Sequence, residues 1–260
     1  MNSPELSCII PTFNDRINLR RAVDSVLTQP QVSVEVVLVD DCSDAETRDF
    51  IIALSASDTR IQHFFMPYNA GQSQARNIGA TLATAPVITF LDQDDEHVEG
   101  WYRVALDYLK QQPTLGAMAG SSEIVDLPAR LGIDENDLRL RGLSAVFATS
   151  VVLRKSVFMA IGGFPIGQVW RSPAAGEDAI FRMALVQSWH AGQCAHPALR
   201  HHAREGGSTV RFLDRTFVRD GQVVTTHQDP VVSSGAPQAA ADEFLQRAGK
   251  YAAEIGAALQ

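Results

Sequence analysis

The sequence predicts an α/β fold: a doubly wound, mainly parallel β-sheet with helices on both faces. Short runs of β-branched and aromatic residues alternate with stretches of helical periodicity through the first part of the chain, which is the pattern of parallel strands joined by helices. Each apolar run ends in polar or acidic residues. Because ligands bind beyond the carboxyl ends of the strands in such sheets, a binding site is expected along that edge.

The first part of the chain contains four predicted strands and three predicted helices. The strands are short apolar runs, as buried strands are, at residues 6–10, 34–39, 61–65 and 87–91. Helical patterns lie between them at residues 18–27, 46–55 and 73–83. This alternation predicts that the four strands pair in parallel.

The second part of the chain continues with helices and strands in a less regular order. A helix that begins near Trp101 places Ala105 and Leu109 on the same apolar face, and Pro113 ends it. The remaining predicted elements are strands at residues 115–119 and 146–153, a polar surface loop or short helix at 126–142, and helices at 154–161 and 177–189.

Residues 213–260 are interpreted as an extension that follows a domain at residues 1–212. An Asp-Gly pair at 220–221 lies between two short apolar runs and predicts a hairpin, and a linker rich in Pro, Ser and Gly follows at 229–237. Residues 238–259 predict an amphipathic helix, whose apolar face consists of Phe244, Leu245, Ala248, Tyr251, Ala252 and Ile255. Its many alanines suit packing against the preceding domain, or against a second copy in a homodimer, better than insertion into lipid.

Composition and charge exclude several classes of protein. The chain has 260 residues, of which 45% are hydrophobic, as in a globular protein. Its net charge of −8 argues against a nucleic-acid partner. No run reaches the roughly 18 apolar residues of a membrane span, and the first residues lack the basic-then-apolar order of a signal peptide. The three cysteines form no disulfide framework, so a cytoplasmic protein, either free or peripheral to the inner face of the membrane, is expected.

The strongest functional signal is an acidic cluster, Asp92, Asp94 and Asp95, directly after the predicted strand at 87–91. Three carboxylates this close together need a countercharge to remain ionised. A hard divalent cation such as Mn²⁺ or Mg²⁺, carrying a phosphorylated ligand, supplies that charge. A solvated acidic turn is the alternative, but the polar ends of the other strands favour a shared site.

Several short motifs follow one another at characteristic spacing: Pro11-Thr12-Phe13-Asn14, Val39-Asp40-Asp41-Cys42-Ser43-Asp44, Asn69-Ala70-Gly71, Ala75-Arg76-Asn77, Phe90-Leu91-Asp92-Gln93-Asp94-Asp95, Gly162-Gly163-Phe164 and Glu177-Asp178. Together they resemble the family-2 glycosyltransferases of the GT-A fold, from about Leu6 to Thr209. The resemblance implies a Rossmann-like nucleotide-binding half at residues 1–95 and an acceptor and catalytic half at residues 96–212. It also implies an inverting, metal-dependent enzyme that moves a sugar from a nucleotide sugar, with a UDP sugar preferred, to an acceptor hydroxyl in polysaccharide, glycan or glycoconjugate biosynthesis.

The resemblance assigns the metal to the acidic cluster. Asp94 would bind the cation directly, and Asp92 would contact the ribose or the cation. Asp95 is either a further ligand or the N-terminal cap of a helix expected to follow it. His201 or His202 would complete the metal shell or touch the phosphates, and His202 is the preferred candidate.

The nucleotide is assigned to the ends of the earlier strands. Asp41 would accept a hydrogen bond from the uracil ring N–H, with Asp40 turned inward as a structural acceptor. Arg76 would face the pyrophosphate or the acidic cluster, and Gly71 would permit close approach of the backbone. The other nucleotide-binding candidates are Pro11, Thr12, Asn14, Asp92 and Gln93.

An inverting transfer needs a carboxylate that takes the acceptor proton from the face opposite the leaving group. The resemblance assigns this role to Asp178, with Glu177 positioning the acceptor or the neighbouring backbone. The alternative is that both carboxylates only stabilise the start of a helix. Trp170 is expected to form a stacking platform for the acceptor, and Arg204 is expected to contact the acceptor or a phosphate.

Two other classes of function compete with this interpretation. Nucleotidyltransferases also combine a doubly wound sheet with metal-binding carboxylates, but they usually carry a Gly-rich, basic loop after the first strand, which residues 11–16 lack. A non-catalytic nucleotide-sugar-binding subunit is the other class. It is disfavoured because both Asp94 and Asp178 are present.

Overall fold

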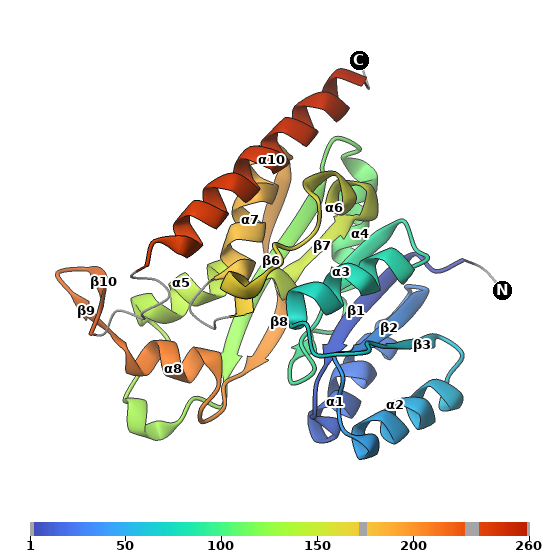
Figure 1. Ribbon diagram of the computed structural model, residues 1–260, viewed down its shortest axis with the longest axis horizontal. Helices are drawn as coiled ribbons and strands as arrows, with labels where there is room; N and C mark the ends of the chain where they lie inside the picture. Colours follow the sequence, from blue (N-terminus) through green and yellow to red (C-terminus); the bar gives the residue numbers. More distant parts are fainter. Residues whose placement is uncertain (1–2, 172–175, 227–233, 259–260) are drawn as a thin grey trace.

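The computed structural model describes residues 3–171, 176–226 and 234–258 of the chain. Within these ranges, an eight-stranded sheet has the order β3-β2-β1-β4-β7-β6-β8-β5, and a two-stranded hairpin lies outside it (Figure 1). The strands are β1 (Leu6–Thr12), β2 (Val34–Asp40), β3 (Ile61–Phe65), β4 (Val87–Phe90), β5 (Glu96–His97), β6 (Ala117–Val125), β7 (Val151–Arg154), β8 (Ala191–His202), β9 (Thr216–Arg219) and β10 (Gln222–Thr225).

The predicted doubly wound, mainly parallel sheet is confirmed. β1 to β4 are parallel to one another, and β6 is parallel to β8. β7 runs antiparallel between β4 and β6, and the short edge strand β5 is antiparallel to β8. The chain passes from β1 to β2 on one side and later returns to β4 on the other side. The carboxyl ends of β1 and β4 therefore form the switch point at which such sheets bind ligands.

Helices cover both faces of the sheet, because neighbouring side chains of a strand point to opposite faces. One face, with Cys8 and Ile10 of β1, packs against α1, α2 and α4, and the other face, with Ile9, packs against α3, α6, α7 and α10. The helices are α1 (Arg16–Leu27), α2 (Ala45–Ser57), α3 (Gln72–Leu82), α4 (Trp101–Gln111), α5 (Leu138–Val146), α6 (Lys155–Ile161), α7 (Glu177–Ser188), α8 (Ser208–Asp214) and α10 (Ala236–Ala258), with 3-10 turns η1 (Ala129–Leu131), η2 (Ala148–Ser150) and η3 (Gln168–Arg171).

The second half differs from the sequence prediction in several elements, among them β7, β5 and β8. The strand expected at 146–153 is the shorter β7, because α5 and η2 occupy residues 138–150 and only residues 151–154 find partners in β4 and β6. No helix begins directly after Asp95, because Glu96 and His97 pair with β8 as β5, and α4 begins only at Trp101. β8 was not predicted, since polar residues and a proline interrupt its apolar pattern.

The C-terminal residues form the predicted hairpin and helix. β9 and β10 pair around Asp220 and Gly221, both at positive φ, as an Asp-Gly hairpin turn requires. α10 runs beside α7 in Figure 1, and it contacts both α6 and α7. The predicted linker at 229–237 lies mostly outside the described residues. Across the described residues, no helix is both long enough and apolar enough to cross a membrane.

The buried face of α10 is shorter than predicted. Phe244 is 3% exposed and Ala248 is fully buried in the core on the α3 side of the sheet, whereas Tyr251 is 41% exposed. We therefore expect Phe244→Ala to lower the free energy of unfolding by about 3–5 kcal/mol, the usual cost of removing a buried phenylalanine. Urea unfolding checks this, with Tyr251→Ala as the control variant that should cost far less. Equal losses in the two variants would contradict the packing of α10.

His97 is a buried core residue of β5. Its ring is 3% exposed, with Nδ1 at 2.6 Å from the Tyr102 hydroxyl and Nε2 at 2.8 Å from the Thr149 carbonyl oxygen. Because a carbonyl oxygen only accepts, Nε2 carries the proton and Nδ1 accepts from the hydroxyl of Tyr102. Burial lowers the pKa of His97 to about 4.

This lowered pKa makes stability depend on pH. Below a pH of about 6.5, the ordinary histidine value, His97 binds a proton in the unfolded chain but not in the folded one. The stability that neutral His97 contributes is fully present above that pH and is lost as the pH falls toward 4. The free energy of unfolding then falls by on the order of 3 kcal/mol. Urea unfolding at pH 7 and pH 4.5 should therefore show a smaller drop in stability for His97→Gln than for the wild type. An identical drop in both proteins would contradict the assignment.

Candidate active site

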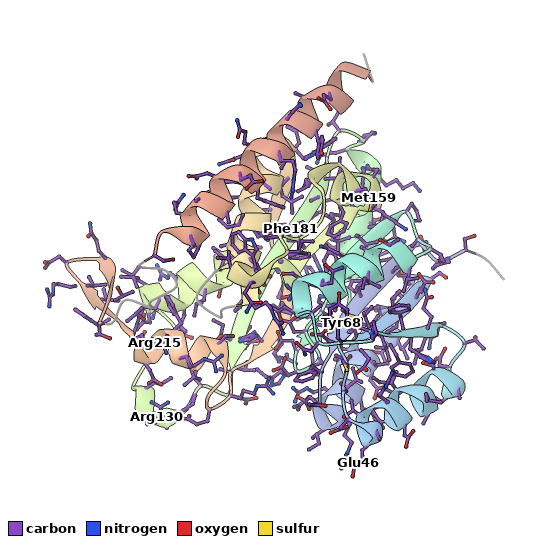
Figure 2. The ribbon with its side chains drawn as sticks, in the orientation of Figure 1. Glu46, Tyr68, Arg130, Met159, Phe181 and Arg215 are labelled. Atoms are coloured by element: carbon purple, nitrogen blue, oxygen red, sulfur yellow. The ribbon has the colours of Figure 1, made fainter. Side chains whose placement is uncertain are left out.

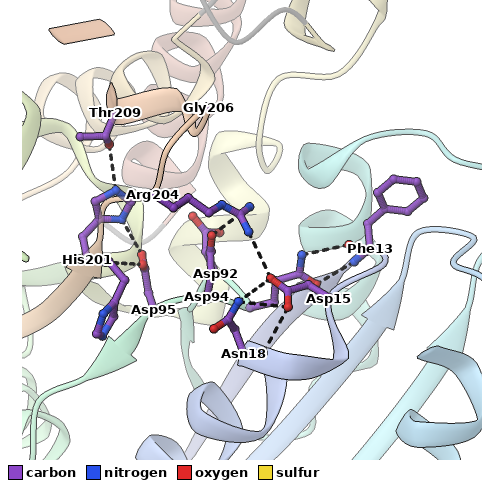
Figure 3. Close-up of polar contacts among 12 residues, drawn as sticks. Phe13, Asp15, Asn18, Asp92, Asp94, Asp95, His201, Arg204, Gly206 and Thr209 are labelled. Atoms are coloured by element: carbon purple, nitrogen blue, oxygen red, sulfur yellow. Dashed lines mark hydrogen bonds and ion pairs between the residues drawn. The ribbon is translucent and has the colours of Figure 1, made fainter. Parts of the chain in front are cut away.

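The polar ends of β1, β2 and β4 meet at one edge of the sheet, beside the loop before α3 and the first turn of α7. This edge brings together most of the residues predicted for the site. Figure 3 shows the part of it that contains the acidic cluster, Asp92, Asp94 and Asp95.

Asp41 follows β2 and is held by the loop that leads into α3. Its carboxylate accepts hydrogen bonds from the backbone N–H of Ala70 at 2.7 Å and of Gly71 at 2.8 Å. Gly71 has a φ of 94°, a conformation that suits glycine. Burial raises the pKa of Asp41, although these two N–H groups favour its ionised form. The fully buried Asp40 accepts from the N–H of Ser43, which is the structural role predicted for it.

The predicted nucleotide-binding residues of the other strand ends also lie at this edge. The side-chain amide of Gln93 accepts from the N–H of Phe13 at 2.8 Å and donates to its carbonyl oxygen at 3.0 Å. Asn14, at a φ of 48°, accepts a backbone N–H from the loop after β2. Pro11 and Thr12 are the buried last residues of β1. The polar side chains here therefore bond within the protein and fix the shape of the edge.

Arg76 of α3 links two carboxylates that are far apart in sequence. Its Nη2 lies 2.6 Å from Oδ1 of Asp92, and its Nη1 lies 2.6 Å from Oδ1 of Asp178. Burial alone would lower the pKa of this fully buried guanidinium, but the charges of Asp178, Asp92 and Glu177 outweigh it and raise the pKa. The structure thus places Arg76 against the acidic cluster, one of the two predicted alternatives, and adds a contact to Asp178 that the sequence did not indicate.

Glu177 and Asp178 form the first turn of α7, where the helix dipole stabilises negative charge. Burial raises the pKa of both carboxyl groups, and the nearby charge of Arg76 opposes the shift in each. Glu177 also accepts a hydrogen bond from the side chain of Gln72 in α3. The side chain of Asp178 is still 21% exposed, so a bound molecule can reach it.

Arg204 bridges two carboxylates across the same edge (Figure 3). Its guanidinium lies 3.0 Å from Asp94 and 3.2 Å from Asp15, the residue that caps α1. Burial raises the pKa of Asp94 to about 6, assisted by the charges of Asp95 and Asp92 and opposed by Arg204. A further cation near Asp94 would therefore favour its ionised form.

Asp95 is bonded inside the protein, and the two candidate histidines point in different directions. The 1% exposed Asp95 carboxylate contacts Nδ1 of His201 at 2.9 Å and accepts the backbone N–H of His202 at 3.0 Å. The ring of His202 lies instead between Glu96 and Asp126, at 2.7 and 2.6 Å. The structure therefore places His201, rather than the preferred His202, against the acidic cluster, because successive side chains of a strand point to opposite sides.

The carboxylates fit a cation that takes most of its ligands from outside the protein. Within the described ranges, no group of three or more His, Cys, Asp or Glu side chains is placed to hold a metal ion. Asp94 offers a carboxylate with a raised pKa, and the 29% exposed Asp92 uses only one oxygen for Arg76. Mg²⁺ is commonly bound by one or two carboxylates together with substrate phosphates. Mn²⁺ or Mg²⁺ carried by a diphosphate therefore fits Asp94 and Asp92.

Trp170 does not form the open platform that was predicted for the acceptor. It lies in η3 and is only 7% exposed, so protein covers its ring. The next residue, Arg171, donates to the side chain of Asn69, and its charge opposes the rise that burial causes in the pKa of Asp41.

The sequence prediction missed Gln72, Asn77 and Arg171, which all join α3 or the loop before it to residues 164–178. The signal for Asn77 was its place directly after Arg76 in a motif. No sequence pattern marks the other two, because their partners lie about a hundred residues away.

The chain is similar in sequence to known glycosyltransferases. The model of the family described as glycosyl transferase family 2 matches residues 7–162. A Campylobacter jejuni GalNAc(5)-diNAcBac-PP-undecaprenol beta-1,3-glucosyltransferase is 35% identical over 114 residues, which are 44% of this chain and 36% of that protein. The putative teichuronic acid biosynthesis glycosyltransferase TuaG of Bacillus subtilis is 31% identical over 119 residues, 46% of this chain and 47% of that protein. The chain thus spans less than half the length of these relatives.

The fold is shared with a solved structure. S. aureus TarS 1-349 in complex with UDP-GlcNAc superposes with a TM-score of 0.62 at 19% identity, and the match covers 79% of this chain and 60% of that one. This likeness confirms the GT-A-type arrangement of the sheet and its helices.

Proposed function

This chain belongs to glycosyl transferase family 2, and from that premise we propose that it moves a sugar from a UDP sugar to a hydroxyl of a carbohydrate or glycoconjugate acceptor, with inversion at the anomeric carbon. Such a reaction serves polysaccharide, glycan or glycoconjugate biosynthesis. We infer that residues 1–95 bind the nucleotide, that residues 96–212 bind the acceptor and supply the base, and that residues 213–260 form an extension.

One observation carries the proposal: a single buried arginine holds a donor-side carboxylate and a helix-end carboxylate in a fixed relation. Arg76 contacts Asp92 and Asp178 at 2.6 Å each. Asp92 lies at the switch point of the sheet, where a nucleotide is expected, and Asp178 reaches the same edge from α7. An inverting transfer needs the donor on one side of the anomeric carbon and a base on the other, and the fixed relation of Asp92 to Asp178 supports a site of this kind.

The residues support sugar transfer in a single displacement step. An oxygen of Asp178 takes the proton of the acceptor hydroxyl while the acceptor oxygen forms a bond to the anomeric carbon. The bond from that carbon to the diphosphate oxygen breaks, and its electron pair leaves with UDP. Asp41 and the backbone around Gly71 hold the uracil ring of the nucleotide. Arg204 is placed to contact the diphosphate once its guanidinium leaves Asp94. Asp94 and Asp92 would hold a divalent cation, which would supply positive charge to the leaving diphosphate.

The competing classes are less well supported. A nucleotidyltransferase that bound phosphate at the start of α1 would need free backbone N–H groups there, but Asp15 places its own carboxylate on the N–H of Asn18. Burying Arg76 between two carboxylates costs free energy, because charged groups are removed from water. A catalytic role accounts for this arrangement, whereas a non-catalytic subunit would not need it. Because sugar nucleotides are made in the cytoplasm, we propose that the reaction occurs there, free or at the inner face of the membrane.

Calorimetry of UDP binding tests the metal part of the proposal. We expect UDP to bind more tightly with Mn²⁺ than in EDTA. Asp94→Ala should reduce the metal-dependent affinity by at least about 10-fold, since even changes to residues behind metal ligands cost that much. Asp107→Ala, which removes an exposed carboxylate of α4, is the control and should bind normally. Equal UDP affinity with Mn²⁺ and in EDTA would contradict the metal assignment.

A further inference from the structure

α3 is the element at which the two halves of the site are joined. Polar side chains of α3 and the loop before it contact residues 164–178 in four pairs: Asn69 with Arg171, Gln72 with Glu177, Arg76 with Asp178, and Asn77 with Phe164. The first three pairs include charged residues of the proposed nucleotide or acceptor region. The Asn77 side chain contacts only the backbone of Phe164, so it acts on the site through other residues.

The side-chain amide of Asn77 bonds in both directions with one residue. Its Nδ2 donates to the carbonyl oxygen of Phe164 at 3.0 Å, and its Oδ1 accepts the N–H of Phe164 at 2.8 Å. The preceding Gly163 has a φ of 78°, and a Cβ there would lie 2.5 Å from Oδ1 of Asn77. Only glycine allows the chain to come this close, so the contact depends on the local sequence on both sides.

The ring of Phe164 is the surface on which Arg76 lies. The guanidinium carbon of Arg76 is 4.9 Å from the ring centroid, within the range of a cation–π contact. The ring of Phe164 also stacks on Phe181 of α7, with 4.2 Å between ring centroids, and meets Phe90 of β4 edge-on at 5.0 Å. Figure 2 labels Phe181, a residue of α7, in the middle of the molecule. The place of this ring therefore affects both the guanidinium and the helix that carries Asp178.

Arg76 has few other restraints. Its Nε is buried and has no hydrogen-bond partner among the residues that the structure describes. Two carboxylates and the Phe164 ring hold the guanidinium. If the ring moved, the geometry of both 2.6 Å contacts would change with it.

We propose that Asn77 is a positioning residue for sugar transfer: by fixing the backbone of Phe164, it sets the place of Arg76 and thereby the relation of Asp178 to Asp92. This inference rests on the proposed function, in which Asp178 is the base. Asn77 contacts neither Asp41 nor Asp94. Its loss should therefore slow transfer without weakening nucleotide binding.

Kinetics of Asn77→Ala provide the first test. We expect kcat for UDP release from the UDP sugar that the wild type uses to fall by about 10- to 100-fold, as when a distant change displaces a catalytic group, while UDP affinity is unchanged. Thr81→Ala removes an exposed hydroxyl from the same helix, whose hydrogen bond goes to the backbone carbonyl oxygen of Asn77 and not to its side chain, so it should leave kcat unchanged. In a Phe164→Leu background, Asn77→Ala should have little further effect on kcat, because the two residues act in series. If Asn77→Ala does not fold, Asn77→Ser carries the same test.

A crystal structure of the variant provides a test that does not depend on activity. We expect Arg76 to leave its 2.6 Å contact with Asp178 in Asn77→Ala but to keep it in Thr81→Ala. A wild-type kcat, a parallel loss of UDP affinity, or an unmoved Arg76 in a folded variant would overturn the inference. If the wild type transfers no sugar, the proposed function fails, and displacement of Arg76 in the crystal would still establish the positioning contact.

Discussion

Asp178→Asn is expected to bind UDP and metal as the wild type does and to lose at least about 100-fold in kcat, the lower range for removal of a general base. The amide is nearly the same size as the carboxylate, and its oxygen can still accept the hydrogen bond from Arg76 at 2.6 Å. It cannot take a proton from an acceptor hydroxyl. Steady-state kinetics and UDP calorimetry on the same preparation separate the two effects.

Glu177→Gln is the matched comparison, because Glu177 is the neighbouring carboxylate in the first turn of α7 and is also buried near Arg76. We expect a smaller loss of kcat in this variant. A larger loss in Glu177→Gln than in Asp178→Asn would assign the base to Glu177. Near-normal turnover in both variants would show that neither carboxylate is the base.

Arg76→Met should lower stability strongly. It leaves Asp92 and Asp178 without their shared cation in a buried site, and removing one partner of a buried ion pair typically costs about 3–5 kcal/mol. Urea unfolding measures the loss. Arg76→Lys keeps the charge but cannot bridge two carboxylates as a guanidinium does, so it should be more stable than Arg76→Met while remaining impaired in turnover.

A double variant identifies the source of the loss. In Arg76→Met with Asp178→Asn, one of the two uncompensated charges is removed, so the combined loss of stability should be smaller than the sum of the single losses. Additive losses would mean that the 2.6 Å contact does not couple the two residues. The same measurement on Arg76→Met with Asp107→Asn, in which the second carboxylate is exposed on α4, should give additive losses.

The first half of the fold could be predicted because its signals are local. β1 to β4 are short, mainly apolar runs with helices between them, and each strand appears within a few residues of its predicted place. The second half depends on pairing between distant segments. β7 is limited by its partners in β4 and β6, and β8 is recognisable only once it lies between β6 and β5. Such pairing leaves little trace in the sequence of one strand.

The residue types of the site could be predicted, but their directions could not. The acidic cluster, Asp41 and the carboxylates of α7 lie along one edge of the sheet, as expected. Which of His201 and His202 faces the cluster depends on the register of β8, since neighbouring side chains alternate. The indole ring of Trp170 is of a type that stacks on sugars, yet tertiary packing buries it.

The most direct test of the central account is release of UDP from a panel of UDP sugars by the wild type, by Asp94→Ala and by Asp178→Asn, each with Mn²⁺ and with EDTA. Water serves as the acceptor, so the natural acceptor need not be known. The account predicts that the wild type releases UDP from at least one sugar with Mn²⁺ and that EDTA or either substitution abolishes the release. UDP release that is unchanged in EDTA and in Asp178→Asn, or release of pyrophosphate in place of UDP, would contradict it.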